Sequence, residues 1–427
     1  MVTIKRQQMS RTILAILLLA MATVTPRAGY GQGRPITLDE AVRTALQSNL
    51  GLQSSALEVD VQKQLKRTAT EIPKTQALLM YGQYNSLNKD NNLTLTQSIP
   101  FPTVFTSQAK LGTMHVQSSE YKRSTSENEL TYQVKQVYQM LRYLHAQHGL
   151  LLRQDSIFAD LVRITSLQYK TGEATLLQKT SSETRYNEVQ NLIRQNQADQ
   201  RTYGSQLQIL MNTPDEIAIM PSAYLPLSTT LVDDSTQVAS NPMLAYQHSL
   251  SNIAYQQKKV DSNKALPDLT VGYFNQTLTG FQQQLDGTDR YFSTDDRFSG
   301  FLVGVAIPIW FIPAHARVKA SSIRSSAAQL NAQYLEKQLY GEWNSAVQQF
   351  YKYQNSLEYY NRSALPNAEL ILRQSNLAYR AGDISQADYR LNLQQALAIE
   401  ETYLQTILQY NQSIVTLEFL SGKYYKN

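Results

Sequence analysis

The feature that most constrains this chain is an internal duplication. The segment LQYKTGE, which begins at Leu167, reappears as LAYRAGD at Leu377, 210 positions later, with the tyrosine, the glycine and the acid in the same places. The same offset relates LQIL at 207–210 to LEFL at 417–420. A chain that repeats itself at a fixed period builds its fold from copies of one structural unit. We therefore expect a first repeat over 32–212, a linker over 213–239, a second repeat over 240–420 and a short tail over 421–427.

The second copy is longer than the first in its early part. QSNLGLQ around Asn49 and ASNPMLA around Asn241 lie 192 positions apart, whereas the Ile-Pro pairs at 99–100 and 307–308 lie 208 apart. The growing offset places an insertion between these landmarks. The stretch 275–297, rich in Gln, Thr, Gly and Asp, predicts a long loop there.

Each copy predicts a helix, two strands, a long helix and a returning helix. Thr37, with Glu40 three residues later, predicts the N-cap of a first helix that ends at Pro73. The hydrophobic period then changes to two, which predicts strands near 77–100 in the first copy and near 268–307 in the second.

A very long helix follows each pair of strands. The first runs from about 103 to 168 without proline, and at 1.5 Å per residue it would be roughly 100 Å long. The second covers about 314 to 378, where Pro366 predicts a kink or a local break. Gly172 and Gly382 lie in the turns at 169–174 and 379–384 that lead to the returning helices.

The N-terminus predicts a signal peptide over residues 1–31. Lys5, Arg6 and Arg11 precede an apolar run at 13–24, which is too short to span a bilayer as a helix. No later stretch reaches about 18 apolar residues. Any part of the mature chain that enters a membrane would therefore have to be β-strands of a closed barrel.

Two predicted strands per copy cannot close a barrel within one chain. An open sheet leaves unpaired backbone groups that lipid does not satisfy, so the chain has to oligomerise, and three chains would supply 12 strands. The few helical columns of one chain likewise cannot fill a rod with a hydrophobic core, but they can form part of a wall around a wet lumen. The expected fold is mostly α with a small β part: a trimer with a 12-stranded transmembrane β-barrel continued by an α-helical barrel.

Trp310 and Phe311 follow the last predicted strand. Aromatic side chains at this place are typical of the girdle at a lipid–water boundary, which would make membrane lipid a partner. A soluble sandwich with a core tryptophan is the alternative.

The whole mature chain resembles the outer-membrane efflux proteins of the TolC-like family. The resemblance rests on ITLDEAVRTALQSNL (36–50), SNPML (240–244), the paired Ile-Pro strand ends, the two hairpins and YNQSIVTLEFLSG (410–422), in this order. It implies a homotrimer in the outer membrane that extends into the periplasm, with the linker and the tail in an equatorial belt. It also implies an exit duct that conducts passively for an inner-membrane transporter of the RND type and a periplasmic adaptor protein.

The resemblance also implies roles for individual residues. The hairpin tips of this family dock with the adaptor, and the matching positions here are Tyr169, Thr171, Gly172, Glu173, Tyr379, Ala381, Gly382 and Asp383. Turns without a partner are the alternative. A related duct has an aspartate six residues after the second hairpin glycine, in its constriction; here this position is Asp388, which could equally be an exposed helix acid. The second constriction aspartate of that duct matches Leu391, which weakens the correspondence.

Only two short segments of the sequence bear on the identity of the cargo. AGDISQADYR and LEFLSGK are most similar to the outer-membrane components of heavy-metal efflux systems, of the copper/silver and cobalt/zinc/cadmium type, so heavy-metal cations are the first expectation and drugs the second. Relatives of that type are often lipidated, whereas this chain has no cysteine to carry a lipid. Attachment through the barrel alone is expected.

Several other functions are not supported by the sequence. His145 and His148 stand three apart on a helix, but without a nearby carboxylate cluster we interpret them as surface residues and predict no metal site. We find no phosphate-binding loop, nucleophile elbow or acid pair, and so predict neither an enzyme nor a cofactor. The net charge of +5 is scattered, which argues against nucleic acid. A protein-secretion channel and a structural coiled coil without a pore remain as alternatives.

Overall fold

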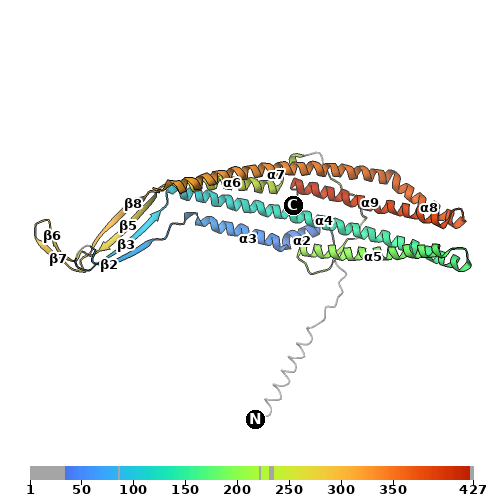
Figure 1. Cartoon of the computed structure of the whole chain (residues 1–427), viewed down its shortest axis with the longest axis horizontal. Helices are drawn as coiled ribbons and strands as arrows, with labels where there is room; N and C mark the ends of the chain where they lie inside the picture. The colour runs from blue at the N-terminus through green and yellow to red at the C-terminus, as the bar shows by residue number, and fades with distance from the viewer. Residues whose placement is uncertain (1–33, 85–86, 221–222, 230–234, 424–427) are drawn as a thin grey trace, which may run out of the picture.

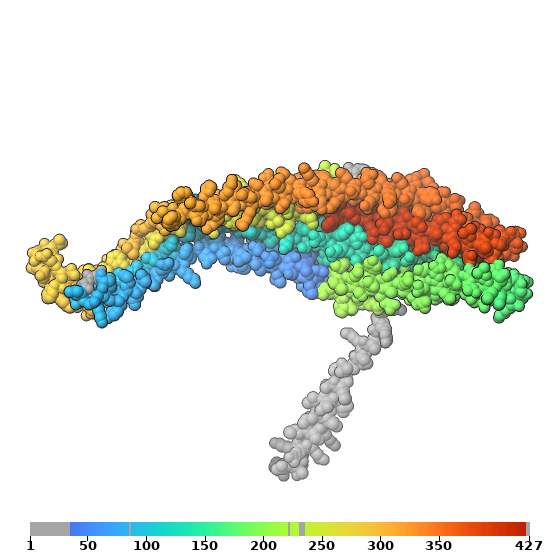
Figure 2. All heavy atoms as spheres, viewed as in Figure 1, coloured from blue at the N-terminus to red at the C-terminus, as the bar shows by residue number. Residues whose placement is uncertain are grey.

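The computed structural model describes residues 34–84, 87–220, 223–229 and 235–423. They form one long, arched molecule, mostly helical, with a small sheet at one end and two helical hairpins at the other (Figures 1 and 2). This confirms the expected fold class of a mostly α protein with a small β part. The signal peptide predicted for 1–31 lies outside the described residues.

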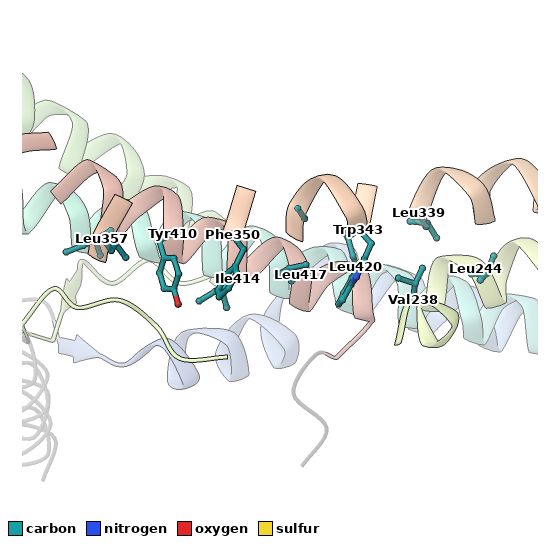
Figure 3. Close-up of a cluster of buried hydrophobic side chains, with 12 residues drawn as sticks. Val238, Leu244, Leu339, Trp343, Phe350, Leu357, Tyr410, Ile414, Leu417 and Leu420 are labelled. Carbon is teal, nitrogen blue, oxygen red and sulfur yellow. The ribbon is translucent and has the colours of Figure 1, made fainter. Parts of the chain in front are cut away.

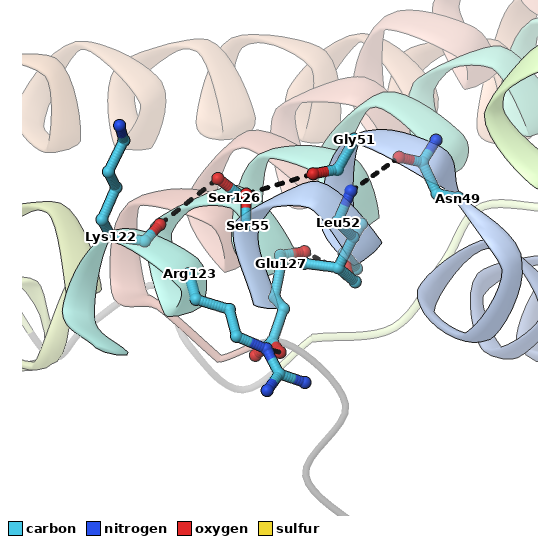
Figure 4. A network of polar contacts seen from close by, with 9 residues as sticks. Asn49, Gly51, Leu52, Ser55, Lys122, Arg123, Ser126 and Glu127 are labelled. Atoms are coloured by element: carbon cyan, nitrogen blue, oxygen red, sulfur yellow. Dashed lines mark hydrogen bonds and ion pairs between the residues drawn. The ribbon is translucent and has the colours of Figure 1, made fainter. Parts of the chain in front are cut away.

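The first helical segment is divided at Asn49. The sequence predicted one helix, but the structure has α2 (Leu38–Ser48), α3 (Leu50–Leu65) and a 3-10 turn, η1 (Lys66–Thr70). Asn49 has an extended backbone, and its side-chain oxygen accepts a hydrogen bond from the Leu52 N–H at 3.1 Å (Figure 4). Its side-chain amide donates to the Leu210 carbonyl at 2.9 Å. The break is stable because Asn49 caps the new helix and joins it to a distant one.

The four predicted strands form one antiparallel sheet. Its order is β2 (Gln76–Gly82), β3 (Asp90–Ile99), β5 (Asp268–Gln276) and β8 (Phe298–Ala306). The insertion is not simply the long loop that its composition predicted. It contains a separate hairpin, β6 (Gly280–Gln283) with β7 (Asp289–Phe292), whose turn is closed by Asp286 and by Gly287 at a φ of 82°.

The long helices continue from the sheet. The first is α4 (Pro102–Thr171), which turns back into α5 (Leu176–Met211). The second is divided, as Pro366 predicted: α7 (Phe311–Tyr359) is followed by a π-helical turn, η3 (Tyr360–Ala364), and by α8 (Leu365–Ala381), with Pro366 in the first turn of α8. Proline has no N–H to donate, and the wider π turn accommodates the interruption. The chain then returns through α9 (Gln386–Ser421).

Short elements lie near the middle of the rod. Strands β1 (Arg34–Ile36) and β4 (Ile217–Ile219) pair in parallel, and η2 (Ser235–Ser240) leads into α6 (Pro242–Asn263). The Tyr138 hydroxyl of α4 donates to the Ile36 carbonyl at 3.0 Å, which attaches the strand pair to the rod. These elements form a local second layer over an otherwise thin wall.

The buried side chains form separate clusters along the rod rather than one central core. One lies where α7 and α9 meet and is centred on Trp343, Phe350, Ile414 and Leu417 (Figure 3). A second cluster joins α2, α4 and α5, and a third lies near the hairpin tips. This distribution suits a wall that is one helix thick.

Candidate functional site

The sheet has two open edges. In the described part of the chain, β2 pairs only with β3 and β8 pairs only with β5, so each has a row of backbone groups facing away from the sheet. The helices that continue from the strands lie in the same order, α3, α4, α6 and α7. The edge strands therefore continue into the edge helices.

Both edge helices have apolar side chains on the side that faces away from this chain. On α3 the exposed stripe consists of Leu50, Leu57, Val61 and Leu65, opposite the buried Leu52 and Val59. On α7 it consists of Ile323, Leu330 and Tyr334, with Leu330 64% exposed. Exposed apolar stripes of this kind mark interaction surfaces.

The two faces of the sheet differ in polarity. The register places Ala77, Leu95, Tyr273 and Phe301 in one cross-strand row. The same face continues through Leu79 and Leu93 on one side of that row and through Val271 and Val303 on the other. The opposite face carries mainly Thr, Ser, Asn and Gly with a few apolar side chains, including the row of Leu78, Thr94, Phe274 and Gly300. One face suits lipid, and the other can line a wet channel.

Trp310 and Phe311 lie where β8 gives way to α7. Trp310 precedes the first turn of α7 and is 85% exposed, and Phe311 and Ile312 are also exposed. The tryptophan is therefore not a core residue in this chain, which removes the alternative of a sandwich packed around it.

The two hairpin tips, at the end opposite the sheet, are built alike. Gly172 and Gly382 end α4 and α8 with φ values of 81° and 82°, a backbone conformation that favours glycine. Thr175 and Ser385 then start α5 and α9 with reciprocal capping boxes. The predicted tip residues Thr171, Glu173, Ala381 and Asp383 are exposed in these turns.

The two tip tyrosines have different surroundings. Tyr169 is exposed and lies 5.5 Å from the Lys179 ammonium, measured to the ring centroid. Tyr379 stacks on Tyr389, with ring centroids 4.6 Å apart and planes within 3° of parallel. Burial raises the pKa of both Tyr379 and Tyr389, so these hydroxyls stay neutral at ordinary pH. Of the two predicted tyrosines, Tyr169 is exposed and Tyr379 is half-buried.

The structure also joins the two hairpins to each other. The Arg390 guanidinium donates to the Ser181 hydroxyl, and the Gln386 amide donates to the Ser182 hydroxyl at 3.0 Å. Along the wall, Arg153 of α4 pairs with Glu400 of α9. Functional roles for Tyr389, Arg390 and Ser181 were not predicted from the sequence. The 210-residue offset could have drawn attention to Tyr389, since it occupies the position of Lys179 in the first copy.

Asp388 has a local role in the structure. Its carboxylate accepts hydrogen bonds from the Ser385 hydroxyl at 2.6 Å and from the Ser385 N–H at 3.3 Å, which completes the capping box of α9. The side chain is exposed, and Leu391 is 63% exposed one turn further on. The same position of the first hairpin is Gln178, which caps α5.

The histidine pair does not form part of a ligand cluster. His145 is exposed, and its Nδ1 lies 2.9 Å from the Leu141 carbonyl of its own helix. Within the described ranges, no three His, Asp or Glu side chains come together as metal ligands would. The same residues include no helix that is both long and apolar enough to cross a bilayer.

Comparison with known proteins identifies the fold. No protein-family model matches the chain, and no curated protein matches it by sequence. The structure is similar to that of the outer-membrane channel OprN, with a TM-score of 0.77, 14% sequence identity, and coverage of 90% of this chain and 89% of that one. It is also similar to the CmeC outer membrane channel of Campylobacter jejuni, with a TM-score of 0.74, 15% sequence identity, and coverage of 90% of this chain and 85% of that one. It is similar to CusC as well, whose structures concern transmembrane channel formation. Here the TM-score is 0.74 and the sequence identity 14%, and the match covers 93% of this chain and 95% of that one. The resemblance to TolC-like outer-membrane channels is therefore confirmed for the fold of the single chain.

Proposed function

We propose that this chain is one protomer of a homotrimeric exit duct in the outer membrane. It would conduct substrates passively from an inner-membrane pump and a periplasmic adaptor to the exterior. The observation that carries this proposal is the pair of matching open edges. Sheet and helices leave the same two sides uncovered, and the likeness to outer-membrane channels supports the same reading.

A head-to-tail ring covers both edges at once. The β8 edge of one copy pairs with the β2 edge of the next, while the apolar stripe of α7 packs against that of α3. Since every contact joins two different surfaces, the interface is heterologous and needs a closed ring. Three copies of four strands make 12 strands, which lies within the range of natural membrane barrels.

The orientation in the membrane follows from the polarity of the sheet. The face with Leu95, Tyr273 and Phe301 would contact lipid, and Trp310 and Phe311 would lie at the boundary with the periplasm. The helical wall would then extend into the periplasm, with the hairpin tips at its far end. We propose that no enzymatic step is involved.

The tips are the proposed docking surface for the adaptor. Tyr169, Thr171, Gly172 and Glu173 on one hairpin, and Ala381, Gly382 and Asp383 on the other, offer exposed side chains and backbone at two similar turns. Tyr379 would support its turn from beneath, because its ring is stacked on Tyr389. We retain Asp388 as a candidate for an acidic ring at the constriction, in addition to its capping role.

Single-channel recording on the full chain in planar bilayers tests the proposal. We expect a trimer by native mass spectrometry and discrete conductance steps. Leu330→Glu on the apolar stripe of α7 should abolish the trimer and the current, because it buries a charge in the interface. Gln329→Glu, at the exposed neighbouring position, is the control and should retain both. A stable monomer with no conductance for the unmodified chain would refute the duct.

A second experiment tests the cellular role. Deletion of the gene in a strain without redundant ducts should sensitise cells to the substrates of the pump. The candidate substrates are heavy-metal cations and drugs, and the panel should contain both classes. Unchanged tolerance to every compound would count against efflux and would favour the protein-secretion alternative.

A further inference from the structure

The junction between the sheet and the helical wall contains a large open cleft of about 950 Å³. Side chains from all four columns line it: Lys66 beyond α3, His115 on α4, Lys264 at the end of α6 and Arg317 on α7. The elements that carry these residues meet next to the sheet, at the end of the rod opposite the hairpin tips (Figure 1).

One observation places this cleft on the inner face of the proposed duct. Asp268, which lines it, starts β5 on the same face as Thr270 and Gly272, the polar face of the sheet. In this respect the inference rests on the proposed function, because the polar face of the sheet becomes the lumenal face only when the ring closes.

The cleft carries an excess of positive charge. Lys66, Lys264 and Arg317 are exposed in it, beside the acids Glu71 and Asp268. In the described part of the chain none of these three cations forms an ion pair within 4.0 Å. Their charge is therefore available to a ligand. A cleft with low-dielectric walls concentrates ions of the opposite sign.

The floor of the cleft is apolar. Val104 and Leu111 line it together with Ala69, Pro73 and Pro100. An inorganic anion would use the cations but leave this apolar surface against water. A hydrated metal cation would meet three like charges against the two acids, and it would also leave the apolar surface against water. A ligand with an apolar body and one negative group satisfies both parts of the lining.

We propose that this cleft binds amphiphilic organic anions as they pass through the duct. The lysine and arginine side chains would hold the carboxylate or sulfonate group, and the apolar residues would cover the hydrocarbon part. Three copies around the axis would form a cationic collar below the barrel. This narrows the cargo to organic compounds with an acidic group and disfavours bare heavy-metal cations.

The test uses two aromatic probes of similar size and opposite charge. Naphthalene-2-sulfonate is the anion and 1-methylquinolinium the cation, each added to full-length channels in planar bilayers. We expect the anion to block the current about tenfold more strongly than the cation, because several exposed cations act on one ligand. Neutralising Lys66, Lys264 and Arg317 together to glutamine should remove this difference.

A matched control removes the same charge from the same three columns. Lys63, Lys259 and Lys319 are exposed, do not line the cleft, and lie on α3, α6 and α7. Their glutamine triple variant should be blocked like the unmodified channel. If both variants lose the block equally, general surface charge explains it and the cleft has no specific role. If the unmodified channel does not distinguish the probes, the proposal is wrong while the duct stands.

Lipid could supply a similar ligand, since an anionic headgroup on a hydrocarbon tail has the same chemistry. The recordings are therefore made in phosphatidylcholine bilayers with and without phosphatidylglycerol. A lumenal site should give the same block in both. If phosphatidylglycerol weakens the block by naphthalene-2-sulfonate, the cleft faces lipid rather than the lumen, and the proposed binding of organic anions inside the duct is wrong. Absence of any current would refute the duct itself and, with it, this assignment.

Discussion

The two hairpin tips occupy equivalent places in the duplicated chain but are stabilised differently. In the first, Tyr169 is exposed beside Lys179, and no aromatic ring among the residues that the structure describes packs against it. In the second, Tyr379 stacks on Tyr389, the residue at the position of Lys179. The turn glycines and the capping boxes are nevertheless the same.

This difference shows which parts of a duplicated unit are free to change. The backbone reversal needs a glycine and a cap in both copies, because these satisfy the ends of the helices. The side chains one turn further on, Lys179 in the first copy and Tyr389 in the second, are not needed for the reversal and differ between the copies. The second hairpin has a stacked ring pair next to its turn, and it is joined to the first hairpin through Arg390 and Ser181.

The largest expected effect is on the stacked pair. Tyr389→Ala should destabilise the second tip by about 3 kcal/mol, because it removes a ring that is 9% exposed and packed against another ring. Lys179→Ala, at the equivalent position, should cost less than about 1 kcal/mol. Hydrogen exchange of the two tips in the full chain measures both changes. If Tyr389→Ala and Lys179→Ala reduce the protection of their tips equally, the stacked rings do not stabilise the second tip more than Lys179 stabilises the first.

The connection between the hairpins should give the next effect. Arg390→Ala removes a charged donor to Ser181 and should favour separation of the hairpins by about 1.5 kcal/mol. In the proposed duct this predicts a larger fraction of open channels in single-channel recording. Arg194→Ala, an exposed arginine on α5 that makes no such bond, is the control. An unchanged open fraction in the Arg390 variant would separate this contact from gating.

Substitutions in the two capping boxes should have similar effects on stability. Asp388→Ala and Gln178→Ala should each destabilise the start of their returning helix by about 1 kcal/mol. Asp388→Asn retains the oxygen that caps the helix but removes the charge. If Asp388 forms a constriction ring, cation preference should fall in both Asp388 variants and not in the Gln178 variant. Cation preference unchanged by Asp388→Asn would leave only the capping role.

Alkaline pH should give the smallest effect. Because burial raises the pKa of Tyr379 and Tyr389, the unfolded chain loses these protons first as the pH rises. Their contribution is therefore fully present below about pH 10 and is lost as the pH increases through the folded-state values. Hydrogen exchange over this range should show the second tip weakening. The Tyr379→Phe/Tyr389→Phe variant should lose this pH dependence, and Tyr169→Phe should not.

Most of the fold was predictable because it depends on local patterns. Gly172, Gly382 and the alternating residues of the strands act through their own backbone, so the turns and the sheet were placed correctly from the sequence. Asn49 was missed as a helix boundary because its role includes a bond to Leu210, far away in the chain. The hairpin of β6 and β7 was missed because its polar composition is also that of a loop.

The sequence by itself determined the duplication, the order of helices and strands, and the two turns, since each follows from spacing and local conformation. Only the tertiary structure decided which side chains meet across elements. It placed Asp388 in a capping box, Tyr379 on Tyr389, and Lys66, Lys264 and Arg317 around one cleft. Such contacts depend on how columns far apart in the chain lie against one another, and neither periodicity nor composition encodes that arrangement.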